Sequence, residues 1–146
     1  MQIQTSRFGT IEIDERKVIN FPHSIPGFTE RDFIVVMIES HLPFLWLQAL
    51  HNPDLAFVIA DPFLFFPDYL PNVNNADKAF LGITGDMLIY AITVVREGAH
   101  VTMNLLAPIV VNPSTNIARQ VVLENSNYTV RHNVPLSTIQ AKVAAI

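Results

Sequence analysis

The side chains best placed for chemistry in this 146-residue chain are two aspartates that frame an aromatic stretch. Asp61 and Asp68 enclose the sequence Pro-Phe-Leu-Phe-Phe-Pro. Two carboxyl groups can catalyse hydrolysis when an apolar neighbourhood keeps one of them protonated. Each aspartate also adjoins a proline, and aspartate beside proline is common in turns because its side chain accepts hydrogen bonds from nearby N–H groups. The turn role is favoured, and a small hydrolase remains an alternative.

Histidines are the other candidates, and their spacing does not match a helical zinc pair. The chain also has no cysteine, which removes disulfides, thiolate nucleophiles and thiolate metal ligands. Nucleophile elbows, phosphate-binding loops and dinucleotide fingerprints do not occur in the sequence. We therefore expect no catalytic residue, no metal and no cofactor, and a protein that is not an enzyme. The histidines are His23, His41, His51, His100 and His132.

A carbohydrate-binding module is a further alternative, because exposed aromatic rings can stack on sugars. Trp46 is the first candidate, and this class of protein requires Trp46 and Phe63 to be exposed. The stretch 43–50 is apolar on both faces apart from Gln48, which is typical of a buried central strand. A core position is therefore favoured for Trp46, with Gln48 hydrogen-bonded to the backbone.

Composition favours a protein that binds other proteins. Charged residues make up 15% of the chain and apolar residues 50%, so apolar surface is available for contacts. The net charge is −4, and it arises within residues 51–90, where Lys78 is the only basic residue among five acids. Such a segment repels phosphate backbones and attracts a basic partner, although it could also serve solubility alone. Direct nucleic-acid binding is therefore not expected.

The start of the chain lacks a basic flank followed by an apolar run, so we expect no signal peptide. Its longest apolar runs are much shorter than the roughly 20 residues that span a bilayer. We expect a soluble, cytoplasmic protein with no membrane contact.

Short segments rich in Val, Ile, Phe and Thr alternate with turn residues, which predicts strands joined by turns. Gly9 suits a tight hairpin between a strand at 2–8 and the alternating Thr-Ile-Glu-Ile-Asp. A helix is predicted only at 75–81, with Asn75 as its N-cap and Gly82 at its end. Further strands are predicted at 18–21, 33–38, 44–50, 55–60, 87–95, 101–106, 109–112 and 117–124.

These elements predict an all-β domain, a small antiparallel β-barrel-like or sandwich fold with one short helix near 75–81. We assign residues 1–136 to a single domain. The C-terminal tail, 137–146, is either helical or disordered, since its apolar spacing fits both.

Two segments offer apolar side chains to a partner. If 61–69 is a short strand, Phe63 and Phe65 lie on one side and Leu64 and Phe66 on the other, so one pair is free. The second segment, 101–112, has a proline break that could leave an unpaired apolar edge, although burial is favoured for most of its side chains.

Several motifs occur in the order and spacing typical of one known family, and the similarity extends from about residue 3 to 136. The chain resembles the bacterial flagellar assembly factor FliW family. The motifs are IPGF (25–28), PFLWLQAL (43–50), NPDLAFVIADPFLFFPDY (52–69), NLLAPIVVN (104–112) and NYTVRH (127–132).

The resemblance implies a small, mostly β, non-enzymatic protein that works by partner exchange. Proteins of this family bind newly made flagellin near its C-terminal region. They also bind CsrA, an RNA-binding translational repressor of flagellin synthesis, away from its RNA-contacting surface. Flagellin that accumulates occupies the FliW-like protein and thereby releases CsrA. This role also implies a monomer when the protein is free.

The resemblance and the two apolar segments together give a set of candidate partner-binding residues. The chain departs from the family pattern at 96–100, which is shorter and less acidic, and at 131–136, which is longer. If partner contacts use the loop at 96–100 or the tail, partner choice would differ. The candidates are Phe65, Phe66, Asp68, Tyr69, Met103, Asn104, Leu105 and Leu106.

Overall fold

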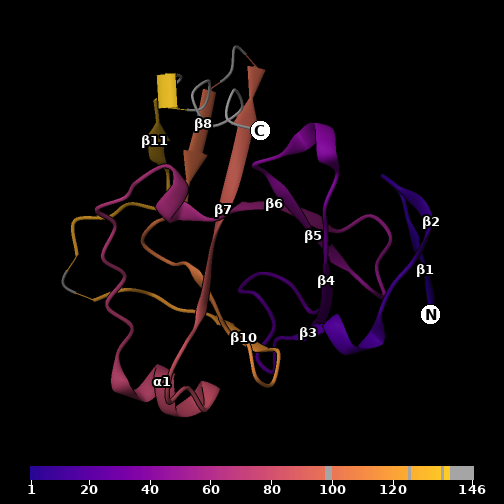
Figure 1. The fold of residues 1–146 in the computed structure, drawn as a ribbon, viewed down its shortest axis with the longest axis horizontal. Helices are drawn as coiled ribbons and strands as arrows, with labels where there is room; N and C mark the ends of the chain where they lie inside the picture. Colours follow the sequence, from indigo (N-terminus) through magenta and orange to yellow (C-terminus); the bar gives the residue numbers. More distant parts are fainter. Residues whose placement is uncertain (98–99, 125, 136, 139–146) are drawn as a thin grey trace.

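A computed structural model gives the architecture of the chain and describes residues 1–97, 100–124, 126–135 and 137–138. Most of its regular structure is strand (Figure 1). The elements are β1 (Gln2–Thr5), β2 (Gly9–Glu12), η1 (Glu15–Lys17), β3 (Ile19–Asn20), β4 (Asp32–Val36), η2 (Glu39–His41), β5 (Leu45–Ala49), β6 (Ala56–Ala60), η3 (Pro62–Leu64), α1 (Asn75–Leu81), β7 (Leu88–Arg96), β8 (His100–Met103), β9 (Ile109–Asn112), β10 (Ile117–Gln120) and β11 (His132–Val134).

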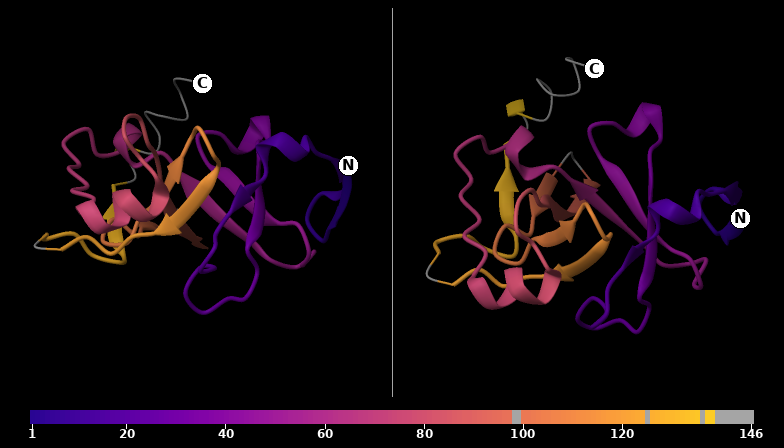
Figure 2. Two further views of the ribbon diagram at one scale, coloured as in Figure 1. Left: turned by 90° about the horizontal axis from the view of Figure 1, so that it is seen from below. Right: turned by 60° about the horizontal axis from the view of Figure 1, so that its bottom comes forward.

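The large sheet closes into a barrel through β7. The strands follow the order β11-β8-β7-β6-β5-β4-β3-β10-β9, and β9 pairs back with β7. The first part of β7 pairs with β9 and its last part with β8, so β8 and β11 extend the sheet beyond the ring. The predicted all-β, barrel-like fold is confirmed, with one departure, because β3 and β10 pair in parallel. Figure 2 shows this twisted ring from two further sides.

Alternation along the ring strands divides the core into an interior and outer layers. Phe33, Leu47 and Ile59 come from three neighbouring strands and pack in one buried cluster with residues of β3, β9 and β10. Their sequence neighbours face outwards. A second cluster forms where the chain from Phe65 to Leu81 packs on the outer side of β7 and β9.

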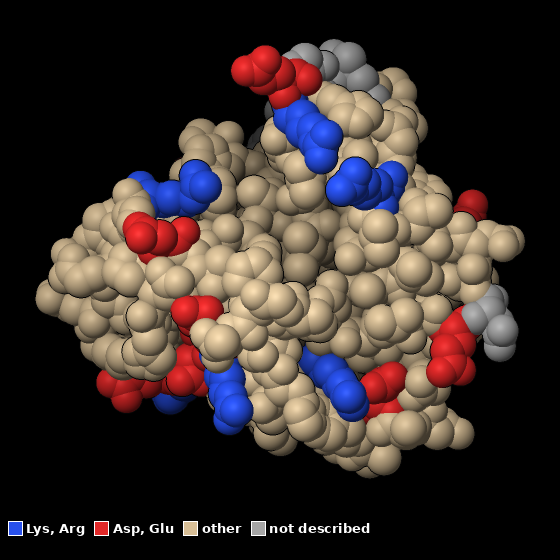
Figure 3. All heavy atoms as spheres, turned by 180° about the vertical axis from the view of Figure 1, so that it is seen from behind, with Lys and Arg blue, Asp and Glu red and all other residues tan. Residues whose placement is uncertain are grey.

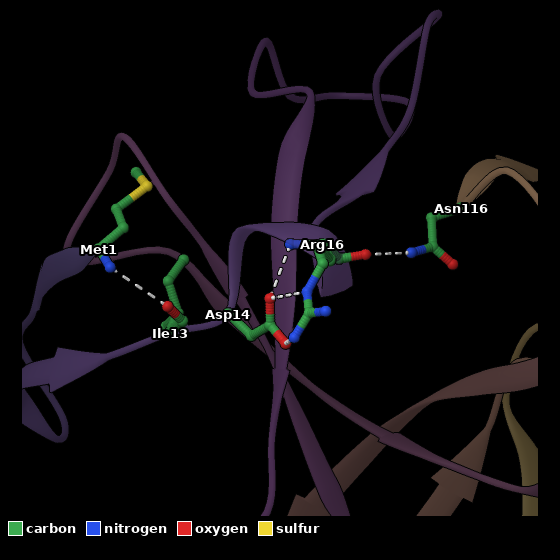
Figure 4. A network of polar contacts seen from close by, with 5 residues as sticks. All are labelled: Met1, Ile13, Asp14, Arg16 and Asn116. Carbon is green, nitrogen blue, oxygen red and sulfur yellow. Dashed lines mark hydrogen bonds and ion pairs between the residues drawn. The ribbon is translucent and has the colours of Figure 1, made fainter.

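The N-terminal hairpin covers the outer side of β4 and β5 and forms a third cluster around Ile34 and Leu50. Gly9 begins β2 with a φ of 69°, as the predicted tight turn requires. Figure 4 shows how the hairpin is attached to the barrel. Asp14 Oδ1 accepts from the N–H of Arg16 at 3.0 Å, and the carbonyl of Arg16 accepts from Asn116 Nδ2 at 2.9 Å.

Helix α1 has the predicted bounds, and Gly82 ends it in the left-handed conformation. Its N-cap is Asn74 and not the predicted Asn75: the side chain of Asn74 accepts from the N–H of Asp77 at 2.8 Å. Asn112 Nδ2 donates to the carbonyls of Leu81 and Gly82 at the other end. The helix is therefore fixed to β9 by a buried amide.

Each predicted strand overlaps an observed strand except the 61–69 segment, and β11 is a strand that the sequence did not predict. The predicted tail at 137–146 lies outside the described residues, apart from 137–138. Within the described residues, the helices are all too short or too polar to cross a bilayer.

Candidate functional site

The 61–69 segment forms a 3-10 turn, so its prediction as a short strand is wrong. Asp61 Oδ1 accepts from the N–H of Phe63 at 2.9 Å, and Pro62 occupies the first position of η3. The turn role predicted for Asp61 is confirmed. Because the segment coils, Phe65 points into the core while Phe63, at 40% exposure, and Leu64 point outwards.

Tyr69 anchors this segment to the barrel from a nearly fully buried position. Its hydroxyl donates to the carbonyl of Leu105 at 2.6 Å, and its ring packs edge-on against Tyr128 with centroids 4.7 Å apart. Burial, with a smaller contribution from Tyr128, raises the pKa of the Tyr69 phenol far above its usual value. Tyr128 also accepts from the N–H of Leu70 at 2.8 Å, so two tyrosines hold the end of the segment.

Of the eight residues predicted to contact partners, the structure buries Phe65, Tyr69, Met103 and Leu105. Buried side chains hold the segments in place and present no atoms for a partner to touch, so as contact residues these four are corrected to core residues. Phe66, Asn104 and Leu106 are half-buried and Asp68 is exposed. Together with the exposed Phe63, Leu64 and Leu70, and joined through the Tyr69–Leu105 hydrogen bond, these side chains make up what we call the 63–70 surface: Phe63, Leu64, Phe66, Asp68, Leu70, Asn104 and Leu106.

The segment after β8 is not the unpaired edge that its proline suggested. Strand β8 pairs with β7 on one side and with β11 on the other. Leu105 N–H donates to the carbonyl of Thr129, and Asn104 Oδ1 accepts from the N–H of Ala107 at 2.9 Å. The 101–107 segment is therefore held by hydrogen bonds, with only part of Asn104 and Leu106 open to solvent.

A groove that sequence reasoning missed lies where β6 and β7 separate. It has a volume of ≈ 700 Å³, which is within the range of binding pockets. Figure 3 shows a hollow on this face, between the part that carries the N-terminal hairpin and the part formed by β7 and β8. The lining residues are Arg7, Ser40, His41, Leu42, Phe44, Trp46, Ala56, Phe57, Val58, Ile92, Thr93, Val94 and Val95.

Trp46 is half-buried in the wall of this groove, so its prediction as a core residue is wrong. Its indole Nε1 donates to His41 Nδ1 at 3.0 Å, and the guanidinium of Arg7 lies over its ring at 4.7 Å from the centroid. Phe8 packs edge-on against the same ring. No local pattern around Trp46 signals this position, because it depends on where β6 and β7 diverge.

Gln48 is buried in the same strand, and its Nε2 donates to the carbonyls of Ala49 and Leu55 at 3.1 Å each. The predicted backbone bonding of Gln48 is therefore confirmed. Its Oε1 has no hydrogen-bond partner among the described residues.

The arrangement of acidic and histidine side chains does not favour a hydrolase. Asp61 is engaged as a helix cap, and Asp68 lies on the exposed side of the segment. In the part of the chain that the structure describes, no three His, Asp or Glu side chains come close enough to hold a metal ion. For the carbohydrate alternative, Phe63 is exposed, but Trp46 stands in a different part of the fold with one ring face under Arg7.

The acidic segment 51–90 does not form one surface in the fold. It runs from the turn after β5, along η3 and then to α1, and these lie at different sides of the molecule in Figure 1. Asp77 pairs with Arg119 at 3.2 Å, and Asp54 accepts from the hydroxyl of Ser6. The excess negative charge is therefore distributed, with Asp68 as its contribution to the 63–70 surface.

Comparisons of sequence and of structure with known proteins identify the same family along almost the whole domain. The sequence model described as FliW protein matches residues 2–134. The flagellar assembly factor FliW of Moorella thermoacetica is 39% identical over 139 residues, which cover 92% of this chain and 88% of that protein. That of Geotalea uraniireducens is 41% identical over 135 residues, covering 90% and 83%. A crystal structure of the flagellar assembly factor FliW superposes with a TM-score of 0.86 at 37% identity, covering 92% of this chain and 98% of the other.

Proposed function

This chain belongs to the FliW family of flagellar assembly factors, and from that membership we propose that it binds flagellin and the translational repressor CsrA in alternation. Free protein would hold CsrA away from the flagellin message, while accumulated flagellin would occupy the protein and release CsrA. Such a mechanism links two binding equilibria and requires no chemical step.

The observation that carries the proposal is the similarity to flagellar assembly factors along almost the whole domain, in sequence and in fold together. The site geometry supports a binding role. Asp61 caps a turn, Tyr69 holds a segment, and the described residues assemble no metal-binding cluster. These side chains position a surface, which is what a regulatory binding protein needs.

We assign the 63–70 surface to partner contact. It combines large apolar side chains such as Phe66 and Leu106 with one carboxylate, Asp68. Exposed apolar area of this kind is typical of interaction sites, and a carboxylate favours a basic partner. Behind it, Tyr69 and Leu105 keep η3 and the chain after β8 together through one buried hydrogen bond. The surface is therefore preformed, and a partner does not have to order it.

The test is a pull-down of the purified chain with purified flagellin and with purified CsrA, followed by competition between the two. We expect each to bind and each to displace the other. Leu106→Asp places a charge on the 63–70 surface and should weaken flagellin binding by about tenfold or more while the chain remains folded.

Met37→Asp is the matched control, because Met37 is an exposed apolar residue directly after β4, outside this surface. It should bind flagellin like the unmodified chain. Binding of neither flagellin nor CsrA would refute the proposed function. Equal affinity of Leu106→Asp and Met37→Asp for flagellin would refute the assignment of the surface.

A further inference from the structure

The groove beside Trp46 exists because the ladder between β6 and β7 stops early. Its last registered pair is Val58 with Thr93, although both strands continue beyond that point. In the other direction the same strands pair at Ala60 and Ala91. The two backbones therefore diverge towards one end of the barrel and leave an opening between them.

Hydrogen-bond alternation shows which backbone groups face this opening. The carbonyl of Leu55 accepts from Ala49 of β5, so residues of β6 with the opposite parity, including Ala56, point towards β7. The carbonyl of Ile92 accepts from Asn104, so Val95 of β7 points away from β8 and towards β6. Ala56 and Val95 would form the next pair of the ladder, and they are not paired with each other. Each thus presents an N–H and a C=O group to the groove.

These groups are accessible, since Val95 is 52% exposed and Ala56 is half-buried. A strand edge with open N–H and C=O groups is a template for another extended segment. Recognition by strand addition uses such edges for affinity and neighbouring pockets for alternate side chains. The groove offers both, because Ala56 and Val95 line it together with apolar and aromatic side chains.

The lining of the groove defines what the side chains of an added segment must be. Its walls are apolar and aromatic, with Phe44, Trp46 and Phe57 as the largest side chains. The volume of ≈ 700 Å³ accommodates more than one side chain of an extended segment. An occupant therefore needs apolar residues at alternate positions, since successive side chains of a strand point in opposite directions.

The charge of the lining is opposite to that of the whole chain. Arg7 is the only fully charged lining residue, although the chain has a net charge of −4. The neighbouring Glu39 belongs to η2 but does not line the groove. Among the described residues, no carboxylate forms an ion pair with Arg7, whose guanidinium lies on the Trp46 ring. A carboxylate of an occupant could pair with this guanidinium without displacing an internal partner.

We propose that this groove binds an extended segment of a partner protein that alternates apolar and acidic residues and adds a strand at the open edge of Ala56 and Val95. Its apolar side chains lie on the face of the sheet that carries Phe57, and on the opposite face, which carries Trp46, one of its carboxylates pairs with Arg7. This surface is distinct from the 63–70 surface and does not depend on the partners proposed there.

The only tryptophan of the chain reports directly on occupancy of the groove. The probe is the acetylated, amidated peptide TVEVEVT, titrated into the full chain while Trp46 emission is recorded. We expect a saturable change in emission, because an added strand removes water from the indole. The matched peptide TVKVKVT has the same apolar pattern with the charge reversed, and it should bind about tenfold more weakly or not at all.

Two variants separate the contributions of charge and backbone. Arg7→Gln should abolish the difference between the two peptides, because it removes the cation and retains a long side chain. Val95→Pro removes an N–H that faces the groove and is not used by the β7–β8 ladder, so it should block binding without unfolding the chain. Val130→Asp alters an equally exposed valine elsewhere and should bind like the unmodified chain.

Four results would overturn the proposal. The first is that neither peptide changes the emission of Trp46. The second is that both peptides bind the unmodified chain with equal affinity. Alternatively, a chain ending at residue 138 binds TVEVEVT at least tenfold more tightly than the full chain, which would make residues 139–146 the occupant. A dilution-dependent Trp46 signal without peptide would make a second copy the occupant.

Discussion

Replacing Tyr69 by phenylalanine tests the anchor that holds the 63–70 surface in place. The variant keeps the ring that packs against Phe63 and Tyr128 and removes only the hydroxyl that donates to the carbonyl of Leu105. That carbonyl then lies buried without this donor. Leaving a buried acceptor unpaired costs about 1–3 kcal/mol, so the free energy of unfolding should fall by that amount at neutral pH.

The difference in the free energy of unfolding between the unmodified chain and Tyr69→Phe should decrease as pH rises. The pKa of Tyr69 is raised in the folded state by burial, so folding favours the protonated phenol. Its contribution is fully present below the ordinary tyrosine pKa of 10.0 and is lost as pH rises above that value. Above about pH 10 the unmodified chain should lose at most about 1.4 kcal/mol per pH unit from this group. The variant lacks this loss, so the two stability curves should converge.

Urea unfolding followed by circular dichroism at several pH values between about 7 and 11 measures both effects. Some loss should remain in the variant, because burial also raises the pKa of Tyr90, with a smaller contribution from Asp61. The double variant with Tyr90→Phe should show a flatter curve still. A difference between the unmodified chain and Tyr69→Phe that stays constant with pH would refute the burial argument, and no difference at pH 7 would refute the role of the hydrogen bond.

Two further predictions concern the helix and the charge of the chain. Asn112→Ala should lower the free energy of unfolding by about 1–3 kcal/mol in urea titrations, because the carbonyls of Leu81 and Gly82 lose their buried donor, whereas Asn133→Ala at an exposed position should have little effect. If the acidic residues of 51–90 steer a basic partner such as CsrA, the association rate should fall markedly with added salt in stopped-flow measurements, and a rate independent of salt would assign these residues to solubility alone.

Local signals in the sequence predicted the structure correctly where a residue type has one dominant conformational role. Gly9 and Gly82 both adopt the left-handed conformation that turns and helix ends require, and both were placed correctly. The 75–81 helix followed from such end signals. The many short strands with one short helix likewise indicated an all-β barrel or sandwich, and the strand at 44–50, predicted to be apolar on both faces, contributes to buried clusters on both.

The wrong predictions have two causes, which are local turn residues that override alternation and packing between distant segments. Alternation assigned Phe63 and Phe65 to the same side, but Pro62 and the Asp61 cap coil the chain and separate them. The strand β11 has the polar sequence His-Asn-Val and forms only because the edge of β8 is available to it. Trp46 lines a groove because β6 and β7 diverge, a property of the closed ring that no local pattern contains.

The parallel contact between β3 and β10 has a consequence for how the molecule assembles. It joins a strand made early in synthesis to one made late, through the single registered pair of Asn20 and Ile117. Contacts so distant in sequence form slowly, since a long loop must close first. During synthesis, the ring cannot close through this contact until the second half of the chain has been made. In the finished protein this short seam should be the first part of the ring to exchange its amide hydrogens with solvent.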